Sequence, residues 1–374
     1  MQSKFRLLVV RLGAMGDILH ALPAMTALRA AHSDWVIDWA VEPRWQALLA
    51  APGSVGRDTG QPAALQPVVD HLHFAPTKEW RHNPFSSQTH REIRNLRQAL
   101  RAGRYDAVLD LQGAMRSAVV GRMAGCRRVI GEARPRERAA SWMFTERVAT
   151  HGAHVIEQDL ELASTVAGDS LQFAEPWLPM DLAMETWADE FLAGSTNRPG
   201  SLYPPGRIRR RNGEQPPVLI NPGAGWGAKR WPVERYAAVA QGLTDRGCDV
   251  LVNAGPGEEP LADAIVKQTG GAAIPIVGQL GQLIALTRRI ALVIAGDTGP
   301  LHLACALGRP VVGIYGPTDP RRNGPFGTRF KVLRSPESRR DHTRNEAPEA
   351  GLLTIQPEDV LRAADALLAE EIVQ

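Results

Sequence analysis

The sequence is poor in cysteine and has no long apolar run. Its 374 residues include three cysteines, Cys126, Cys248 and Cys305, which are odd in number and widely spaced. They make neither a CxxC metal motif nor a disulfide framework, which favours a reducing compartment. No apolar run approaches the roughly 18 residues that a membrane-spanning helix needs. The N-terminal run at residues 7–10 is also too short for the core of a signal peptide. We therefore expect a cytoplasmic protein.

The sequence also lacks the dinucleotide-binding fingerprint G-x-G-x-x-G. Its first glycine-rich turn reads RLGAMGD over residues 11–17, so Gly13 and Gly16 have a different spacing. No acidic residue ends the next expected strand in the usual ribose-binding position, and Glu42 is only a loose candidate for that role. A nicotinamide-dependent dehydrogenase is therefore the weakest of the possible enzyme classes.

What remains is typical of a globular α/β protein. Hydrophobic residues make up 44% of the chain and charged residues 22%, and the length suggests two domains. Short apolar runs alternate with amphipathic stretches in both halves, which predicts parallel sheets with right-handed crossovers. The expected strands are residues 7–12, 35–41, 107–111, 218–221, 249–254, 274–277, 292–295 and 311–315. The expected helices include residues 17–31, 233–246, 279–288 and 356–371.

A change of composition divides the chain. Residues 194–217 are rich in Gly, Pro, Ser, Asn and Arg, and we expect them to link two domains. The predicted organisation is an N-terminal Rossmann-like domain (1–193), this linker, a C-terminal Rossmann-like domain (218–355) and a final helix (356–374). Open α/β sheets bind ligands outside the carboxyl ends of their strands, so we expect an interdomain cleft between the two doubly wound domains. The polar residues 335–350 are expected to form a surface loop.

One glycine-rich turn in the C-terminal half carries positive charge. Residues 221–230 read NPGAGWGAKR and follow an expected strand, so their glycines let the backbone approach a ligand closely. Lys229 and Arg230 could neutralise a diphosphate. A basic surface loop is the alternative interpretation.

A second turn, GDTGPLH at residues 296–302, joins an expected strand to an expected helix. The N-terminus of a helix favours an anion, so Thr298 and the neighbouring N–H groups are suitable phosphate donors. The carboxylate of Asp297 would instead have to orient a donor group or contact a sugar hydroxyl. His302 could contact a phosphate, or it could be a buried core histidine.

Asp17 follows the first glycine-rich turn at the start of an expected helix. Its carboxylate could act as a general base on an acceptor hydroxyl, while Lys229 and the helix dipole stabilise a departing diphosphate. The alternative is a helix N-cap, which is a common use of aspartate. His20, one turn further along, is expected to be a packing residue or to support the site indirectly.

Positive charge is concentrated in residues 81–138. This segment contains thirteen arginines, no lysine and five acidic residues, a formal charge of +8 against +3 for the whole chain. Such a segment could meet nucleic acid, phospholipid headgroups or an acidic glycolipid. Arg91, Arg94, Arg97 and Arg101 follow helical spacing, and a solvated helix face explains them equally well.

In their order along the chain, these motifs resemble glycosyltransferase family 9, the ADP-heptose:lipopolysaccharide heptosyltransferases. The matching segments LGAMGDILHALP, DLQG, KRWP, GDTGPLHL and YGPTDP begin at residues 12, 110, 229, 296 and 315. The resemblance implies a GT-B fold whose C-terminal helix can cross back to the first domain. It also implies inverting, metal-independent transfer of a heptose from ADP-L-glycero-D-manno-heptose, without a cofactor. The closest subtype adds the first heptose to Kdo on lipid A.

The resemblance also implies roles for single residues. Asp17 matches the catalytic base, Lys229 the phosphate-binding lysine, and Asp297 an acidic residue near the donor sugar. Glu258 matches the acidic residue that contacts the adenosine ribose, with Glu259 as an alternative. The other implied donor-site positions are Ala224, Thr298, Gly299, Pro300 and His302. The implied acceptor-site positions are Gly16, Arg116, Arg134, Arg136 and Arg138.

The implied partners are an ADP-sugar donor and an anionic lipid A–Kdo acceptor. We expect transient contact with the inner face of the inner membrane, no nucleic-acid partner and a monomer. Two kinds of alternative stay open. One keeps the fold and changes the substrate, as in a type II or III heptosyltransferase, a hexosyltransferase or a sugar-nucleotide epimerase. The other is a noncatalytic protein that binds a nucleotide sugar or lipid A.

Overall fold

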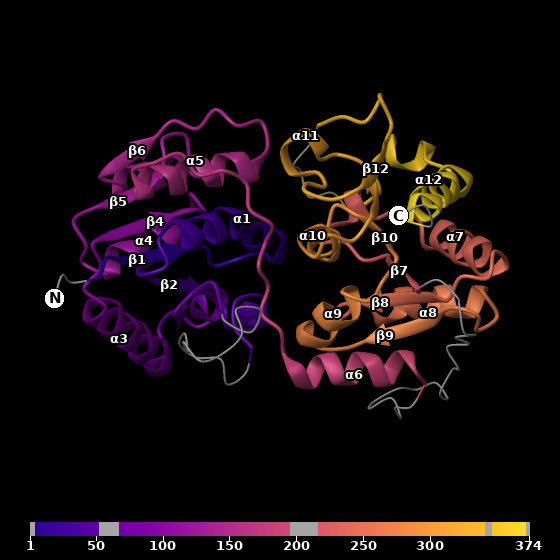
Figure 1. Cartoon of the computed structure of the whole chain (residues 1–374), viewed down its shortest axis with the longest axis horizontal. Coiled ribbons are helices and arrows are strands. Elements are labelled where there is room, and N and C mark those ends of the chain that lie inside the picture. Colours follow the sequence, from indigo (N-terminus) through magenta and orange to yellow (C-terminus); the bar gives the residue numbers. More distant parts are fainter. Residues whose placement is uncertain (1–3, 52–66, 195–215, 341–345, 372–374) are drawn as a thin grey trace. The chain divides into compact units, whose positions relative to one another are not determined.

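The computed structural model describes residues 4–51, 67–194, 216–340 and 346–371, which form two compact units (Figure 1). The first unit ends at Met180 and the second begins at Asp181. Each unit has its own six-stranded parallel sheet with helices. The expected α/β class with two Rossmann-like domains is confirmed.

The sheet of the first unit has the order β3-β2-β1-β4-β5-β6. Its strands are β1 (Arg6–Val10), β2 (Val36–Val41), β3 (His71–Phe74), β4 (Ala107–Asp110), β5 (Val129–Glu132) and β6 (Glu146–Val148). Apart from its first residue, β1 is buried, as a continuous Leu/Val run predicts for a central parallel strand. On one face, α1 (Met15–Ala31) packs against α5 (Val155–Ala167). On the other, α3 (Ser87–Ala102) packs against α4 (Met115–Met123).

Shorter helices lie in the loops of the first unit. They are the 3₁₀ turns η1 (Pro43–Leu48) and η3 (Arg138–Met143) and the short helix α2 (Thr77–His82). η1 follows β2 and packs against α1, while η3 follows β5 and packs against α4. η1 carries Trp45 and η3 carries Arg138, and both residues bear on the candidate site.

The sheet of the second unit has the order β12-β11-β10-β7-β8-β9. Its strands are β7 (Val218–Asn221), β8 (Val250–Ala254), β9 (Ile274–Val277), β10 (Leu292–Gly296), β11 (Val311–Tyr315) and β12 (Phe330–Arg334). Three helices bury one face in a single apolar cluster: α7 (Val233–Asp245), α8 (Glu259–Gln268) and α12 (Pro357–Glu371). The remaining helices are α6 (Leu182–Leu192), α9 (Leu280–Thr287), α10 (Gly299–Ala306) and α11 (Pro320–Asn323).

The boundary between the units lies earlier than residue 193, where the composition placed it. The reason is α6, which packs against α9 of the second unit. Nε of Arg288 lies 3.1 Å from Glu185, and Nε of Arg289 lies 2.6 Å from Asp189. Most of the expected linker lies outside the described residues.

The C-terminal segments pack within the second unit. α12 contacts α7 and the strands β10 to β12, while its expected crossing to the first domain stays a prediction. The expected loop at residues 335–350 is described except for 341–345 and is mostly exposed. Ser335 and Ser338 are buried, however, and the Ser338 hydroxyl donates to Glu349 at 2.9 Å.

Both sheets have the strand order of a doubly wound fold, counted from the first strand of each unit. The order reverses between β1 and β4 in the first unit and between β7 and β10 in the second. Open α/β sheets bind ligands outside the carboxyl ends of the strands at such a switch point. The segments that follow these four strands are therefore the places to look for a site.

Candidate active site

The first part of the candidate site is the turn between β1 and α1 with the first residues of α1. We call this segment, residues 11–17, the first corner. α1 begins at Met15, so Asp17 is the third residue of the helix and not its N-cap. Oδ2 of Asp17 accepts a hydrogen bond from the backbone N–H of Ala14 at 3.0 Å, which satisfies a donor that a helix start leaves unpaired. The helix therefore begins two residues before its predicted start, and the N-cap alternative for Asp17 is wrong, although Asp17 lies in the first turn and its side chain stabilises the helix end.

A buried arginine contacts the same carboxylate. Nη2 of Arg11 lies 3.4 Å from Oδ1 of Asp17, and the side chains are 7% and 36% exposed. The ion pair orients a carboxylate that is still reachable from solvent. Such a carboxylate can act as a general base on an incoming hydroxyl. Arg11 is the first residue of the RLGAMGD turn, but the sequence alone does not reveal that its side chain is buried or that it contacts Asp17.

Gly13 makes room for an aromatic ring at this corner. Its φ is +153°, and an added Cβ would lie 2.7 Å from Nε1 of Trp45 in η1. A side chain at this position would displace Trp45 or the turn. His20, further along α1, is buried and meets the ring of His154 edge-on at 5.6 Å between centroids, as expected of a packing residue.

Asp110 ties the turn after β4 to this corner. Its Oδ1 accepts hydrogen bonds from the N–H groups of Gln112 and Gly113 and from the hydroxyl of Ser117. Gln112 in turn accepts the N–H of Leu12 at 2.7 Å. Burial raises the pKa of Asp110 to about 6. The DLQG motif therefore fixes the geometry of the switch point.

Some of the implied acceptor residues gather at the same corner. Gly16 is the second residue of α1. Nη1 of Arg116 lies 3.8 Å from the buried carboxylate of Glu42, at the end of β2. The loop that carries Arg134, Arg136 and Arg138 is held there because the N–H of Glu137 donates to Gly113 at 2.9 Å.

The arginines of this loop and those of α3 differ in their surroundings. Arg134, Arg136 and Arg138 are exposed close to the first corner. Arg91, Arg94, Arg97 and Arg101 are exposed along α3. The four arginines of α3 are therefore explained as the solvent-exposed face of an amphipathic helix, without a bound ligand.

The second corner lies in the second unit and is centred on Asp297, which follows β10. Nζ of Lys229 lies 2.5 Å from Oδ2 of Asp297, and Nε2 of His302 lies 3.1 Å from Oδ1. Burial alone would raise the pKa of Asp297. The hydrogen bond from His302 and the charge of Lys229 outweigh it and hold the pKa well below its usual range. The carboxylate therefore orients two cationic or hydrogen-bonding groups, one of the roles expected of it.

The start of α10 completes this corner. Thr298 is the N-cap, but its hydroxyl donates to the carbonyl of Gly296 at 3.2 Å and does not cap the helix. Gly299 and Pro300 form the first two helical positions. The N–H of Gly299 therefore lies at an uncapped helix N-terminus, which favours an anion. His302 is 6% exposed and bonded to Asp297, so it belongs both to the core and to this corner.

Glu258 lies beside the Lys229 loop. It follows β8, and its Oε2 accepts the N–H of Gly255 at 3.2 Å. A Cβ at Gly223 would lie 1.9 Å from that carboxylate, so the glycine leaves room for it. An acidic residue after the second strand of a Rossmann-like unit is the usual ribose contact. The neighbouring Ala224 is 5% exposed.

Aromatic and C-terminal residues hold the Lys229 loop in place. Nζ of Lys229 lies 4.6 Å from the ring centroid of Trp226, a cation–π distance. Trp231 is 3% exposed and donates through Nε1 to the carbonyl of Ile355 at 3.2 Å. The N–H of Glu349 donates to Ala228 at 3.2 Å. Arg230, the other expected phosphate ligand, is exposed.

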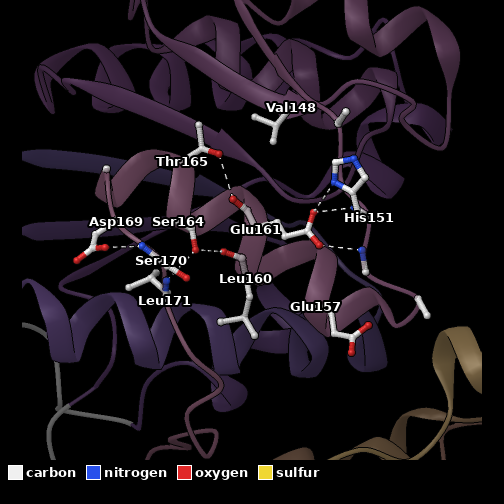
Figure 2. A pocket seen from close by; sticks show the side chains of 14 residues that line it. Val148, His151, Glu157, Leu160, Glu161, Ser164, Thr165, Asp169, Ser170 and Leu171 are labelled. Carbon is white, nitrogen blue, oxygen red and sulfur yellow. Dashed lines mark hydrogen bonds and ion pairs between the residues drawn. The ribbon is translucent and has the colours of Figure 1, made fainter.

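A groove of about 1150 Å³ runs along α5 in the first unit, and none of its lining residues belongs to either corner (Figure 2). Its polar groups satisfy one another. Glu161 accepts the N–H groups of His151 and Gly152, and Ser164 donates to Leu160 while accepting from Leu171. The groove therefore offers no convergent polar groups for a ligand.

The described parts of the chain contain no helix long and apolar enough to cross a membrane. Within the same residues, no group of three or more His, Cys, Asp or Glu side chains is placed to hold a metal ion.

Solved structures with the same architecture identify the fold class of this chain. The glycosyl transferase family 9 structure from Veillonella parvula matches with a TM-score of 0.75 and 21% identity over 99% of both chains. The structure entitled "E. coli heptosyltransferase WaaC with ADP-2-deoxy-2-fluoro heptose" matches with a TM-score of 0.72 and 24% identity, over 97% of this chain and 99% of the other. The fold is that of the GT-B glycosyltransferases.

Sequence comparison gives the family. The model of glycosyltransferase family 9 (heptosyltransferase) matches residues 93–352. Lipopolysaccharide heptosyltransferase 1 of Escherichia coli K12 is 30% identical over 88% of this chain and 94% of its own length. The protein of that name from Pseudomonas aeruginosa is 28% identical over 86% and 81%. The chain belongs to glycosyltransferase family 9 and is a glycosyltransferase.

Proposed function

We propose that this protein transfers L-glycero-D-manno-heptose from ADP-heptose to a Kdo residue of lipid A. The observation that carries the proposal is the second corner, where Asp297 holds Lys229 and His302 beside the uncapped start of α10. This corner suits the diphosphate of a nucleotide sugar. Glu258 suits the ribose hydroxyls. The names of the relatives support ADP-heptose as the sugar nucleotide and lipopolysaccharide as the product.

The proposed reaction is a single displacement. Asp17 removes the proton from an acceptor hydroxyl, the hydroxyl oxygen attacks the anomeric carbon, and the bond from that carbon to the diphosphate oxygen breaks. The electron pair leaves with ADP, and Lys229 with the N-terminus of α10 stabilises the negative charge. Attack from the side opposite the leaving group inverts the anomeric centre. Protein groups supply this charge stabilisation, so we propose that no metal is required.

The anionic acceptor would be bound by the first unit. Arg116, Arg134, Arg136 and Arg138 place positive charge around Gly113 and Glu42 at the first corner. Kdo carries a carboxylate, and arginine binds carboxylates with two parallel hydrogen bonds. We propose that these arginines orient the acceptor for attack.

A donor panel tests the proposal. The purified protein is incubated with Kdo-lipid A and ADP-heptose, ADP-glucose, UDP-glucose or UDP-N-acetylglucosamine, with excess EDTA, and nucleoside diphosphate release is measured. We expect release from ADP-heptose only, dependent on Kdo and unaffected by EDTA. Faster turnover of another sugar nucleotide would contradict the donor assignment, and loss of activity in EDTA would contradict metal independence. A noncatalytic binding protein would bind ADP-heptose without releasing ADP.

A further inference from the structure

Two buried asparagines join the ends of β7 and β8 in the second unit. Asn221 is 3% exposed and Asn253 is 7% exposed. The backbone register pairs Ile220 with Val252, so Asn221 and Asn253 are the next residues along the two neighbouring strands. Burying an amide in an apolar sheet is unfavourable unless its polar atoms are hydrogen-bonded. The proposed chemistry uses neither side chain, so their presence at this edge of the sheet needs another explanation.

The two amides form a chain of hydrogen bonds. Nδ2 of Asn253 donates to Oδ1 of Asn221 at 2.7 Å, and Nδ2 of Asn221 donates to the carbonyl oxygen of Gly223 at 3.2 Å. Because the bond from Asn253 engages the oxygen of Asn221, it turns the NH₂ group of Asn221 toward Gly223. Asn253 therefore fixes the position of Gly223 through Asn221, although it stands on the neighbouring strand.

Gly223 lies against the carboxylate of Glu258. A Cβ on Gly223 would lie 1.9 Å from Oε2 of Glu258, and a Cβ on Gly255 would lie 3.1 Å from the same oxygen. The N–H of Gly255 also donates to Oε2 at 3.2 Å. The carboxylate is thus held between the loop after β7 and the loop after β8. The bond between Asn253 and Asn221 sets the separation of these loops, because each asparagine lies at the end of the strand that leads into one of them.

We propose that Asn221 and Asn253 are positioning residues that hold the Glu258 carboxylate where it meets the ribose hydroxyls, and that they thereby make the site selective for a ribonucleotide. The inference rests on the proposed function in taking Glu258 to contact the ribose. Hydrogen bonds from hydroxyls to a carboxylate are short and directional, so a small displacement of Glu258 removes them. Loss of the amide pair should therefore weaken only the ribose contact and spare the diphosphate contacts of Lys229 and α10.

Calorimetric titration of the full chain with ADP and with dideoxy-ADP, which lacks both ribose hydroxyls, tests the proposal. The wild type should bind ADP about tenfold more tightly, as expected for hydrogen bonds to a charged group. Asn221→Leu and Asn253→Leu should bind ADP about tenfold more weakly than the wild type does, with unchanged affinity for dideoxy-ADP. Asn253→Ala, which removes the amide without adding apolar bulk, should behave in the same way. Unchanged binding of dideoxy-ADP also shows that the variants are folded.

Two controls separate positioning from a structural effect. Thr287→Val removes another buried polar group of the second unit, a hydroxyl that donates to the carbonyl of Leu283 at 2.6 Å at the end of α9. It should leave both affinities unchanged. Glu258→Ala should abolish the preference for ADP, and adding Asn253→Leu to it should cause no further loss of ADP affinity.

The outcomes distinguish this inference from the proposed function. Asparagine variants that keep the wild-type preference for ADP would overturn the inference alone. Variants that bind both nucleotides equally weakly would also overturn it, since the amide pair would then support the fold and not the position of Glu258. Additive losses in the double variant would have the same meaning. A wild type with no preference for ADP over dideoxy-ADP would overturn the ribose contact of Glu258 in the proposed function, and the inference with it.

Discussion

At the scale of single residues, Asp110 and Asp297 are both buried carboxylates that respond to pH in opposite directions. Asp297 has a positive neighbour and a hydrogen bond from His302, so its pKa is lowered and it stabilises the fold above the pKa of the unfolded chain. Asp110 is held mainly by neutral donors, and burial raises its pKa to about 6. Its contribution to stability is greatest when it is protonated and is lost as the pH rises through that value.

This difference gives a prediction for Asp110→Asn. The amide oxygen of asparagine can still accept the three hydrogen bonds made to Oδ1. The free energy of unfolding of the wild type, relative to the variant, should fall by on the order of 1 kcal/mol between pH 5 and pH 7.5. Urea-unfolding curves at several pH values measure this difference. A difference that does not vary with pH would contradict the raised pKa.

Arg11 gives a second prediction at this scale. Arg11→Met removes the group that orients Asp17, so turnover should fall by about ten- to a hundredfold. The affinity for ADP should stay unchanged, because the proposed donor residues lie in the second unit. Steady-state kinetics and calorimetric titration with ADP measure the two effects. Arg11→Lys should recover part of the turnover, and full turnover in Arg11→Met would show that Asp17 needs no such partner.

At the scale of secondary-structure elements, the end of β7 and the start of α8 meet through Gly223 and Glu258. Gly223→Ala should displace the Glu258 carboxylate, because the new Cβ would lie 1.9 Å from Oε2. ADP should then bind about tenfold more weakly, as expected for the loss of a hydrogen bond from a charged group. Calorimetry of ADP binding measures the effect.

A double-mutant comparison provides the control. In Glu258→Ala the obstructing carboxylate is absent, so adding Gly223→Ala should have little further effect on ADP affinity. Additive losses in the double variant would mean that Gly223 acts on the ligand by another route.

The elements also show how far the sequence could predict the fold. Strands such as residues 218–221 and 311–315 were found because they are buried on both faces and therefore read as apolar runs. Four strands were missed. β3, β6 and β12 are sheet edges that are largely exposed or carry charge. β5 is buried and lies inside its sheet, but its apolar run is only Val129-Ile130 before Gly131. The prediction also placed α6 in the first domain. It was wrong because α6 packs against α9, and this packing, which composition does not reveal, puts the boundary between the units before α6.

The sequence predicted the individual residues of the candidate site but not the contacts between them. Glycine turns and charged residues after strands identified Asp17, Lys229 and Asp297. The contact of Lys229 with Asp297 spans 68 residues, and that of Leu12 with Gln112 spans 100. Such contacts depend on which strands become neighbours at the switch point, which local spacing does not encode.

At the scale of the whole molecule, each unit has its own apolar cluster, as is typical of separate domains. We predict that they close when donor and acceptor are both bound, as group transfer in the absence of water requires. Small-angle X-ray scattering should show a smaller radius of gyration with ADP and acceptor together than with neither. Identical profiles would contradict closure.

The central claim is that Asp17 is the base of a heptosyl transfer, and Asp17→Asn tests it most directly. The asparagine oxygen can still accept the N–H of Ala14, so the start of α1 should be preserved. With ADP-heptose and a soluble Kdo acceptor, we predict that turnover falls at least about a hundredfold, the usual effect of losing a general base, while the affinity for ADP-heptose stays that of the wild type. Turnover close to the wild-type value would contradict the account.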